Sequence, residues 1–327
     1  MKILFGVQGT GNGHISRARE VLPLLQRYGE VDLLISGTQA DVHPGGSPRF
    51  SRHGFSFIFG KKGGVDTWKT WRTMNLRQLR RDVKSLPVHD YDLVVNDFEP
   101  VSAWACRVQG KESVALSHQC AFLSTNTPRP SRWNYAELIF KHYAPATHHI
   151  GFHFERYDDF IHTPVIRSEI RRLESVNRGH VTVYLPAYHD QLLTRCFEQL
   201  PDVRWEVFSK HSKAFFTHKN ISVFPVQNEL YNTSMAGSAA VITGGGFEGP
   251  AEAFFMGKKL MVIPMSGQYE QQCNALSAGK AGAKVVRRID RDFVTELNTW
   301  LENTPAVRVN YPDETEAIVD AMIKKYR

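Results

Sequence analysis

Apolar residues in the first half of the chain fall into short continuous runs, separated by segments in which they recur at helical spacing. An apolar run of about four to eight residues bounded by turn residues is typical of a buried strand, whereas apolar positions at i, i+3, i+4 and i+7 indicate a helix. Alternation of the two patterns predicts a parallel sheet with helices on both faces. The predicted strands are residues 2–7, 31–35, 55–59, 93–95 and 113–116.

A second series of the same kind follows an irregular stretch at residues 150–175, where Pro164 disfavours a helical residue before it. We therefore predict an α/β chain with two Rossmann-like domains, residues 1–163 and 164–310, whose parallel sheets face a central cleft. The length of 327 residues agrees, because single cores stop growing at roughly 250 to 300 residues. The second set of predicted strands is residues 181–185, 205–208, 221–224, 239–243, 260–263 and 284–286.

The pattern ends in a helix within residues 311–327. Ile318, Val319, Met322 and Ile323 lie on one face of this helix and must be buried against another part of the molecule. We expect the helix to cross back and pack on the first domain.

Three glycines and a histidine follow the first predicted strand, in the sequence Gly9-Thr-Gly11-Asn-Gly13-His14. At this place a parallel sheet points backbone amides at a ligand, and the helix N-terminus favours an anion. A dinucleotide fingerprint G-x-G-x-x-G needs its third glycine one residue later, and no acid follows the second strand near Ser36. The loop therefore favours a phosphate-bearing ligand other than NAD.

A second glycine loop, Gly244–Gly246, also runs from a strand into a helix and is the strongest signal in the chain. Glu252 lies about one and a half turns into that helix, where its carboxylate can accept hydrogen bonds from both hydroxyls of a ribose. Its neighbours are apolar, so the carboxylate needs a partner. The helix dipole explains Glu248 equally well, because it favours an acid in the first turn.

These two loops resemble those of a known family. The stretch from Gly246 to Glu252, followed by Glu270-Gln271 and Asn274-Ala275, resembles the donor signature of GT-B glycosyltransferases, including plant and bacterial UDP-sugar transferases. The loop before His14 is similar to that of the peptidoglycan lipid II N-acetylglucosaminyltransferase and of galactolipid synthases. The resemblance implies a hexosyltransferase that moves a sugar from a UDP-sugar to an acceptor hydroxyl.

The resemblance also implies catalytic roles. In the family a histidine after the first strand is the general base, and His14 stands at this position; an imidazole suits proton removal at neutral pH. Asp97, at the end of a later strand, matches the aspartate that orients the histidine. Glu99 is a competing base, since it lies at the same strand end. Capping of the following loop explains both acids equally well.

The nucleotide sugar is expected to contact residues of both glycine loops. The resemblance assigns the diphosphate to Gly245 and Gly246, the ribose to Glu252 and the base to the backbone near Val226. Residues 186–189 depart from the family, which has a Gly/Ser phosphate turn there. The expected donor-binding residues are Gly11, Gly13, Val226, Gly244, Gly245, Gly246, Phe247, Glu248, Glu252, Glu270 and Gln271.

The resemblance implies chemistry that needs no cofactor. We expect no paired carboxylates of the D-x-D kind at the site, so helix dipoles and basic side chains must meet the charge of the diphosphate, and we expect no metal ion. Direct displacement of the diphosphate by the acceptor hydroxyl would invert the anomeric centre. Phe247 stands where the plant enzymes have tryptophan, which leaves the identity of the donor less certain than its class.

The chain is basic, with a net charge of +7 and a pI near 9.2, which suits an anionic partner. Residues 61–84 carry eight Lys or Arg against two Asp, interleaved with Trp68 and Trp71. Such a stretch is typical of a helix at a membrane interface, although a solvated helix face explains it equally well. If it docks on lipid, we expect a lipid-linked acceptor and a peripheral position on the inner face of the membrane.

Other functions stay open. The four cysteines form no C-x-x-C pair, which fits a reducing cytoplasm. A nucleotide-sugar epimerase on the same scaffold would convert the donor alone. A non-enzymatic nucleotide-binding or nucleic-acid-binding protein would bind with steep salt dependence, but no nucleic-acid motif accompanies the basic stretch, so we expect no nucleic-acid partner.

Overall fold

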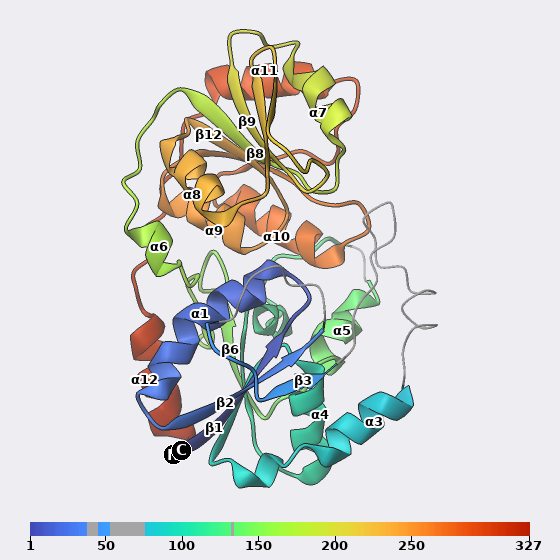
Figure 1. Cartoon of the computed structure of the whole chain (residues 1–327), viewed down its shortest axis with the longest axis vertical. Coiled ribbons are helices and arrows are strands. Elements are labelled where there is room, and N and C mark those ends of the chain that lie inside the picture. Colours follow the sequence, from blue (N-terminus) through green and yellow to red (C-terminus); the bar gives the residue numbers. More distant parts are fainter. Residues whose placement is uncertain (38–44, 53–75, 132–133) are drawn as a thin grey trace.

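Two stacked α/β halves make up the molecule in the computed structural model, which describes residues 1–37, 45–52, 76–131 and 134–327 (Figure 1). Each half has a central sheet with helices on both faces, as the alternating apolar pattern predicted. Every strand predicted within the described residues overlaps a strand of one of the two sheets. The strand predicted at residues 55–59 lies outside the described residues.

The first sheet is parallel throughout its described strands, with β1 between β2 and β4. In register, Phe5 of β1 lies beside Leu33 of β2 and Val95 of β4. This register aligns the carboxyl ends of the three strands at the edge facing the other half. In spatial order the strands are β3 (Phe50–Arg52), β2 (Glu30–Ser36), β1 (Lys2–Gln8), β4 (Leu93–Asp97), β5 (Val114–Ser117), β6 (His148–Phe152) and β7 (Ile161–His162).

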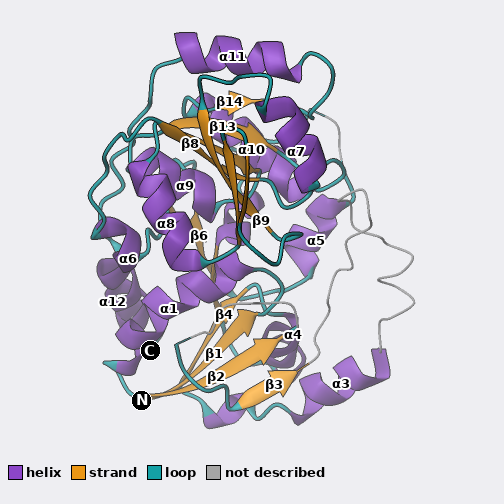
Figure 2. Cartoon of the chain, turned by 45° about the horizontal axis from the view of Figure 1, so that its top comes forward, coloured by secondary structure: helices purple, strands orange, loops and turns teal. Residues whose placement is uncertain are grey.

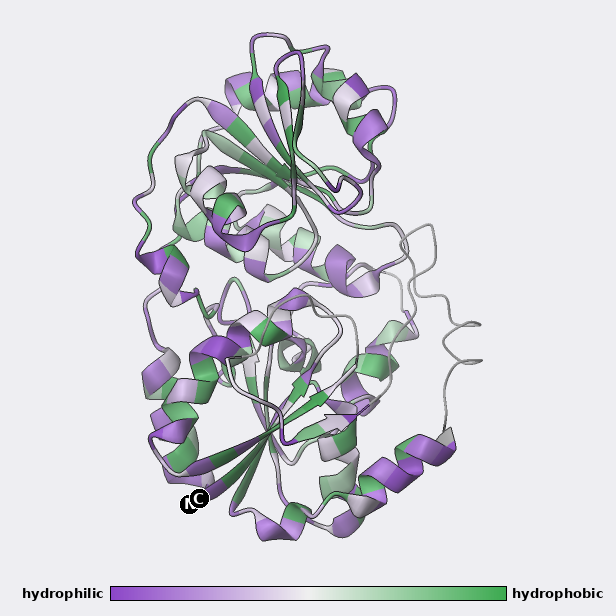
Figure 3. Ribbon diagram, in the orientation of Figure 1, coloured by the Kyte–Doolittle hydropathy of each residue, from purple (hydrophilic) through white to green (hydrophobic). Residues whose placement is uncertain are grey.

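The second sheet has the same parallel arrangement except at one edge, where β10 is antiparallel to β11. Its central strand β8 lies between β9 and β12. In both sheets the strands are hydrophobic along most of their length (Figure 3). In spatial order the strands are β10 (Phe216–His218), β11 (Ile221–Pro225), β9 (Arg204–Ser209), β8 (His180–Tyr184), β12 (Ala240–Gly244), β13 (Lys259–Ile263) and β14 (Lys284–Val285).

Helices cover both faces of each sheet (Figures 1 and 2). In the first half α1 and α12 pack on one face and α3 and α4 on the other, and in the second half α8, α9 and α10 lie opposite α7 and α11. The helices are α1 (Asn12–Gln26), α3 (Leu76–Ser85), α4 (Pro100–Gln109), α5 (Ala136–His142), α6 (Ser168–Arg171), α7 (Asp190–Phe197), α8 (Asn228–Gly237), α9 (Glu248–Phe255), α10 (Tyr269–Lys280), α11 (Phe293–Asn303) and α12 (Thr315–Tyr326).

The terminal helix α12 crosses back to the first half and packs beside α1, as predicted (Figure 1). Its apolar face is buried, with Met322 only 1% exposed. At the rim of this contact, Arg27, which follows α1, donates to Glu316 over 2.6 Å and the Tyr28 hydroxyl donates to Asp320. The chain therefore begins and ends in the same half.

Apolar and aromatic side chains also join the two halves. Phe154, which follows β6, contacts Phe247 and Phe254 of the second half, with ring centroids 5.1 and 5.9 Å apart. One buried cluster therefore extends from α1 and β1 across the junction into α9. Burial of this kind is non-directional and holds the halves together, while hydrogen bonds set their alignment. Within the described residues, no helix combines the length and hydrophobicity needed to cross a membrane.

Candidate active site

A pocket of about 800 Å³ lies between the two halves, within the usual size range of ligand sites. The start of α1 forms one wall, and the loop from β12 into α9 forms another. The carboxyl ends of strands in the second sheet open onto the pocket, which is where open parallel sheets bind ligands. Among the residues lining it are Asn12, Gly13, Ser16, Val226, Gly244, Gly246, Phe247, Glu248, Glu252 and Gln271.

His14 and Asp97 form a hydrogen-bonded pair beside this pocket. His14 lies in the first turn of α1, and Asp97 is the last residue of β4, which pairs with β1. The parallel register thus brings together two residues that are 83 positions apart, with His14 Nδ1 2.8 Å from Asp97 Oδ1. Asp97 is fully buried, whereas 12% of the His14 side chain is exposed. The pair has the geometry of a base and the acid that orients it.

A buried arginine completes this pair. Arg17, one turn after His14 on α1, donates from Nε to Asp97 Oδ2 over 2.9 Å and from Nη2 to Oδ1 over 2.8 Å. Its Nη1 donates to Glu248 Oε1 of the other half over 3.0 Å. Burial by itself would raise the pKa of Asp97, but the neighbouring charges of Arg17 and His14 outweigh it and lower that pKa. Asp97 is therefore ionised at neutral pH.

Glu99 does not belong to this group, so its assignment as a competing base is wrong. Its carboxylate accepts hydrogen bonds from the backbone amides of Val101 and Ser102, both at 2.7 Å, and so caps α4. It is completely buried, and burial raises its pKa. Asp97 and Glu99 are only two residues apart, but the sharp turn at Phe98, with φ of 53°, sends their side chains in different directions.

The first glycine loop brings α1 close to the other half. Gly11 has φ of 109°, a conformation that favours glycine, and a Cβ on Gly13 would lie 2.5 Å from Glu248 Oε2. The bare Cα of Gly13 therefore leaves room for the Glu248 carboxylate. Glu248 is the first residue of α9, where the helix dipole also favours it.

The glycines of the second loop have different roles. Gly244 and Gly246 line the pocket, and a Cβ on Gly246 would meet nothing within 4 Å. Gly245 instead packs against α10, because a Cβ there would lie 2.6 Å from the Gln271 carbonyl oxygen. Its amide donates to Gln271 Oε1 over 3.2 Å. These contacts hold the loop on α10, and the expected contact of Gly245 with a diphosphate stays a prediction.

Phe247 closes the loop at the junction of the halves. Its ring stacks on His118 of the first half, with centroids 3.8 Å apart and an interplanar angle of 4°. His118 Nε2 lies 2.9 Å from Asn274 Oδ1, and Asn274 Nδ2 donates to the Gly245 carbonyl over 3.1 Å. Burial lowers the pKa of His118, so the ring is neutral at neutral pH. The second glycine loop is therefore held from the first half.

Glu252 lines the pocket, but it has a partner within the chain. Arg167 donates from Nε to Glu252 Oε1 over 2.6 Å and from Nη2 to Oε2 over 2.7 Å. Burial raises the pKa of Glu252, and the guanidinium acts in the opposite direction. The apolar neighbours of Glu252 thus pointed correctly to a partner, and Arg167 fills that role. A further contact with a ribose stays a prediction.

The remaining predicted donor residues divide between the pocket and the junction. Val226, just after β11, is 39% exposed and lines the pocket, and so does Gln271, whose Oε1 also accepts from the Met265 amide over 2.9 Å. Glu270 lies outside the residues that line the pocket. It accepts a hydrogen bond from Gln119 Nε2 of the first half over 3.1 Å.

Paired carboxylates of the D-x-D kind occur away from the pocket. Asp90 and Asp92 lie before β4, at the opposite end of that strand from Asp97, and Asp92 accepts from the Lys2 amide over 2.7 Å. Asp290 and Asp292 lie before α11. Across the described ranges, no group of three His, Cys, Asp or Glu is arranged to hold a metal ion.

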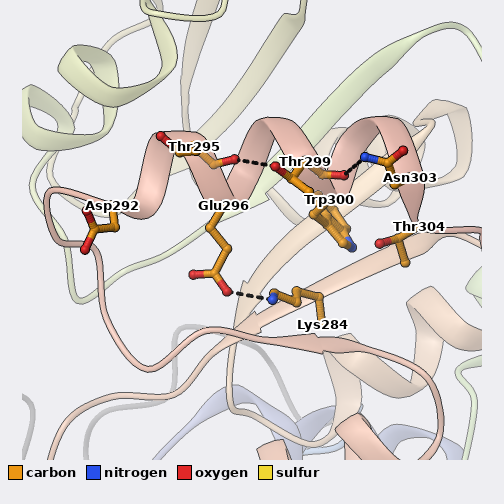
Figure 4. A pocket seen from close by; sticks show the side chains of 8 residues that line it. All are labelled: Lys284, Asp292, Thr295, Glu296, Thr299, Trp300, Asn303 and Thr304. Carbon is orange, nitrogen blue, oxygen red and sulfur yellow. Dashed lines mark hydrogen bonds and ion pairs between the residues drawn. The ribbon is translucent and has the colours of Figure 1, made fainter.

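A second hollow, of about 450 Å³, lies between α11 and β14 (Figure 4). Lys284 is paired there with Glu296 at 2.6 Å. The Thr299 hydroxyl and the Asn303 amide donate back to carbonyl groups of α11 itself. None of the predicted site residues lines this hollow, and the bonds of Thr299, Asn303 and Lys284 are made to α11 itself.

A family model described as Glycosyl transferase family 1 matches residues 1–305. The chain belongs to this family of glycosyltransferases. The protein is therefore a transferase, and its resemblance to glycosyltransferases, seen in the sequence, is confirmed. No curated protein shows significant sequence similarity to the chain.

Solved structures show that this glycosyltransferase has the GT-B fold. MurG from Acinetobacter baumannii superposes with a TM-score of 0.57 at 13% identity, over 99% of both chains. The glycosyltransferase SsfS6 from Streptomyces sp. SF2575, in complex with thymidine diphosphate, gives 0.60 at 14% identity, also over 99% of both chains. A putative UDP-N-acetylglucosamine 2-epimerase from Listeria monocytogenes gives 0.57 at 12%, over 99% of this chain and 96% of that one.

Two arginines of the candidate site were not found from the sequence. Arg17 had a usable signal, because it lies three residues after His14 among apolar positions that face the sheet, where a charge needs a partner. Arg167 had none, since its partner Glu252 is 85 residues away and only the tertiary structure joins them.

Proposed function

We propose that the protein transfers a sugar from a UDP-sugar to an acceptor hydroxyl in the pocket between its halves. The observation that carries the proposal is that Arg17 donates hydrogen bonds both to Asp97, the partner of His14, and to Glu248 at the start of α9. Gly13, next to His14, and Glu248 line the same pocket. A base from one half therefore lies next to a phosphate-binding helix start from the other.

In the proposed reaction, His14 donates from Nδ1 to Asp97, which leaves Nε2 to accept the proton of the acceptor hydroxyl. The acceptor oxygen forms a bond to the anomeric carbon while the bond from that carbon to the diphosphate breaks, and the nucleoside diphosphate leaves with the electron pair. A single displacement of this kind inverts the anomeric centre. Proton NMR of the first product measures the configuration, and a retained anomer would contradict the mechanism.

The charge of the leaving diphosphate is proposed to be met by backbone amides at Gly244 and Gly246 and by the dipole of α9. This supports a reaction that needs no metal ion. Turnover measured with excess EDTA and then with added Mg²⁺ or Mn²⁺ tests this point. Equal rates in both are expected, and loss of activity with EDTA that Mg²⁺ restores would contradict it.

The acceptor is proposed to be lipid-linked, with the protein peripheral on the cytoplasmic face of a membrane. Residues 61–75 of the basic stretch lie outside the described residues, but α3 continues it. Val83 faces the core, while Arg77, Arg80 and Arg81 are exposed. Co-sedimentation with phosphatidylserine vesicles, but not with phosphatidylcholine vesicles, is expected, and each basic residue contributes about 1 kcal/mol. Loss of binding in Arg80→Glu/Arg81→Glu would support α3 as the contact.

The Listeria structure favours one second candidate, a nucleotide-sugar epimerase on the same fold. An epimerase converts its donor without an acceptor. Incubation with UDP-N-acetylglucosamine alone, followed by chromatography of the nucleotide sugars, separates the two functions. A new UDP-sugar would favour the epimerase, whereas an unchanged donor supports transfer.

The first test of the donor half is thermal unfolding with UDP, GDP, dTDP or NAD. A ligand at 100 times its Kd stabilises the folded protein by roughly 2.7 kcal/mol. A shift with UDP that exceeds those of the other nucleotides is expected. No shift with any nucleoside diphosphate would contradict the proposed donor site and favour a non-enzymatic role.

A further inference from the structure

We propose that Arg17 is a positioning residue of the transfer reaction, which fixes Asp97 beside His14 and ties this pair to the start of α9 in the donor half. The proposal rests on the proposed function, in which His14 is the base. It adds a residue that acts through Asp97 and needs no contact with substrate.

The first argument is geometric. Arg17 is 4% exposed, and its planar guanidinium donates to both oxygens of Asp97, over 2.9 and 2.8 Å. A two-point contact fixes the plane of a carboxylate, whereas a single hydrogen bond leaves it free to rotate. With its plane fixed, Asp97 keeps Oδ1 at 2.8 Å from His14 Nδ1 and holds the imidazole in one tautomer.

The second argument concerns charge. The ionised groups around the His14 ring are Asp97 from β4, Arg17 from α1 and, through Arg17, Glu248 from α9, while the Phe98 ring stacks at 6.3 Å. Arg17 Nη2 lies 3.2 Å from His14 Nδ1. Burial would raise the pKa of Asp97, but the Arg17 guanidinium, which stays charged at all working pH values, and His14 lower it. Asp97 therefore stays ionised and accepts the hydrogen bond from the imidazole.

The third argument is the link between the halves. The remaining nitrogen of Arg17, Nη1, donates to Glu248, which is 231 residues away and opens the helix whose N-terminus faces the pocket. Gly13 makes the approach possible, because any side chain there would overlap the Glu248 carboxylate. The alignment of the base therefore depends on the same contact that brings the donor half against α1.

Lysine cannot replace this arrangement. Three hydrogen bonds leave Arg17 in a rigid fork toward two carboxylates, whereas an ammonium group is a point charge on a flexible stem. Arg17→Lys therefore keeps the positive charge but loses the two-point contact with Asp97. Arg17→Gln removes the charge and keeps one donor for Asp97. The glutamine also lowers the risk that a bare buried carboxylate prevents folding.

The test uses the full-length chain without substrate. Long-range proton–nitrogen NMR of ¹⁵N-histidine-labelled protein gives the tautomer of His14, whose signals are assigned by their loss in His14→Gln. In the native protein we expect the proton on Nδ1, because an ionised Asp97 can only accept the hydrogen bond. In Arg17→Gln, which keeps only one donor for Asp97, we expect a mixture of the two tautomers. A single, unchanged tautomer in folded Arg17→Gln would overturn the positioning argument.

Kinetics tests the geometric argument independently. With the donor established for the native protein, Arg17→Lys is expected to lower kcat about tenfold to a hundredfold while the Kd for UDP, measured by calorimetry, stays the same. A native kcat in Arg17→Lys would overturn the positioning role. If the native protein transfers no sugar at all, the proposed function fails, and the NMR measurement still decides whether Arg17 fixes the tautomer of His14.

Discussion

At the residue scale, the site depends on which carboxylates are paired with arginine. Asp97 and Glu252 are buried in different halves, and each accepts two hydrogen bonds from one guanidinium. Buried charges persist only when they are paired and hydrogen-bonded. Glu99 is satisfied instead by backbone amides, which removes it from the chemistry.

Substitution of His14 tests the proposed base. His14→Gln is expected to lower kcat by about 10²- to 10⁴-fold, the usual contribution of general acid–base catalysis, while UDP binding stays unchanged. Initial rates and calorimetry with UDP measure the two effects. The control is His142→Gln, an exposed residue at the end of α5, which should retain native activity. Retained turnover in His14→Gln would remove His14 as the base.

Substitution of Glu252 tests a buried ion pair. Glu252→Ala leaves the Arg167 guanidinium without its bidentate partner, and breaking a buried pair costs about 3–5 kcal/mol. Urea unfolding is expected to show this loss, with weaker UDP binding because the carboxylate also lines the pocket. Glu229→Ala, an exposed acid in the first turn of α8, is the control. Unchanged UDP affinity would argue against the ribose contact.

At the element scale, the glycine loops serve both as ligand-facing turns and as packing surfaces. The loop from β12 into α9 contacts α10 at Gly245 and opens to the pocket at Gly246. The sequence shows three equivalent glycines, and only the neighbouring helix distinguishes them.

Two adjacent alanine substitutions separate these roles. Gly245→Ala places a methyl group 2.6 Å from a backbone oxygen, and such overpacking is expected to cost about 1–3 kcal/mol in the free energy of unfolding. Gly246→Ala meets no atom within 4 Å and should leave stability nearly unchanged. Because Gly246 lines the pocket, its methyl group should weaken UDP binding. Equal stability of the two variants would contradict the packing role of Gly245.

At the scale of the whole molecule, the chain crosses between its halves twice. It leaves the first sheet after β7 and returns through α12, which packs on α1 (Figure 1). The helix that carries His14 and Arg17 is therefore held by residues from the far end of the sequence.

Truncation of a buried side chain tests this support. Met322→Ala is expected to lower the free energy of unfolding by about 2–5 kcal/mol, because it leaves a cavity between α12 and the first half. Urea denaturation measures the loss. Lys324→Ala, on the exposed side of the same helix, should stay within about 0.5 kcal/mol of the native protein. Equal effects would show that α12 does not contribute through its apolar face.

The sequence alone determined the alternation of strands and helices, because apolar periodicity follows directly from burial. The strands at residues 2–7 and 239–243 and the terminal helix were predicted in this way, and so were the two glycine loops at the strand ends. Four of the described strands, β3, β6, β7 and β10, were not predicted, and three of them have only two or three residues, which carry no clear period. The two-residue strand β14 was predicted, because Val286 extends its apolar run. The domain boundary at residue 163 stays a prediction.

Only the tertiary structure decided which polar groups meet. His14 and Asp97, Arg17 and Glu248, and Arg167 and Glu252 are 83, 231 and 85 residues apart, and hydrogen bonding depends on distances of about 3 Å that no local pattern encodes. The turn at Phe98 likewise directs Asp97 to α1 and Glu99 to α4. Burial of apolar residues thus determines where the helices and strands lie, whereas tertiary packing determines which polar side chains become hydrogen-bond partners.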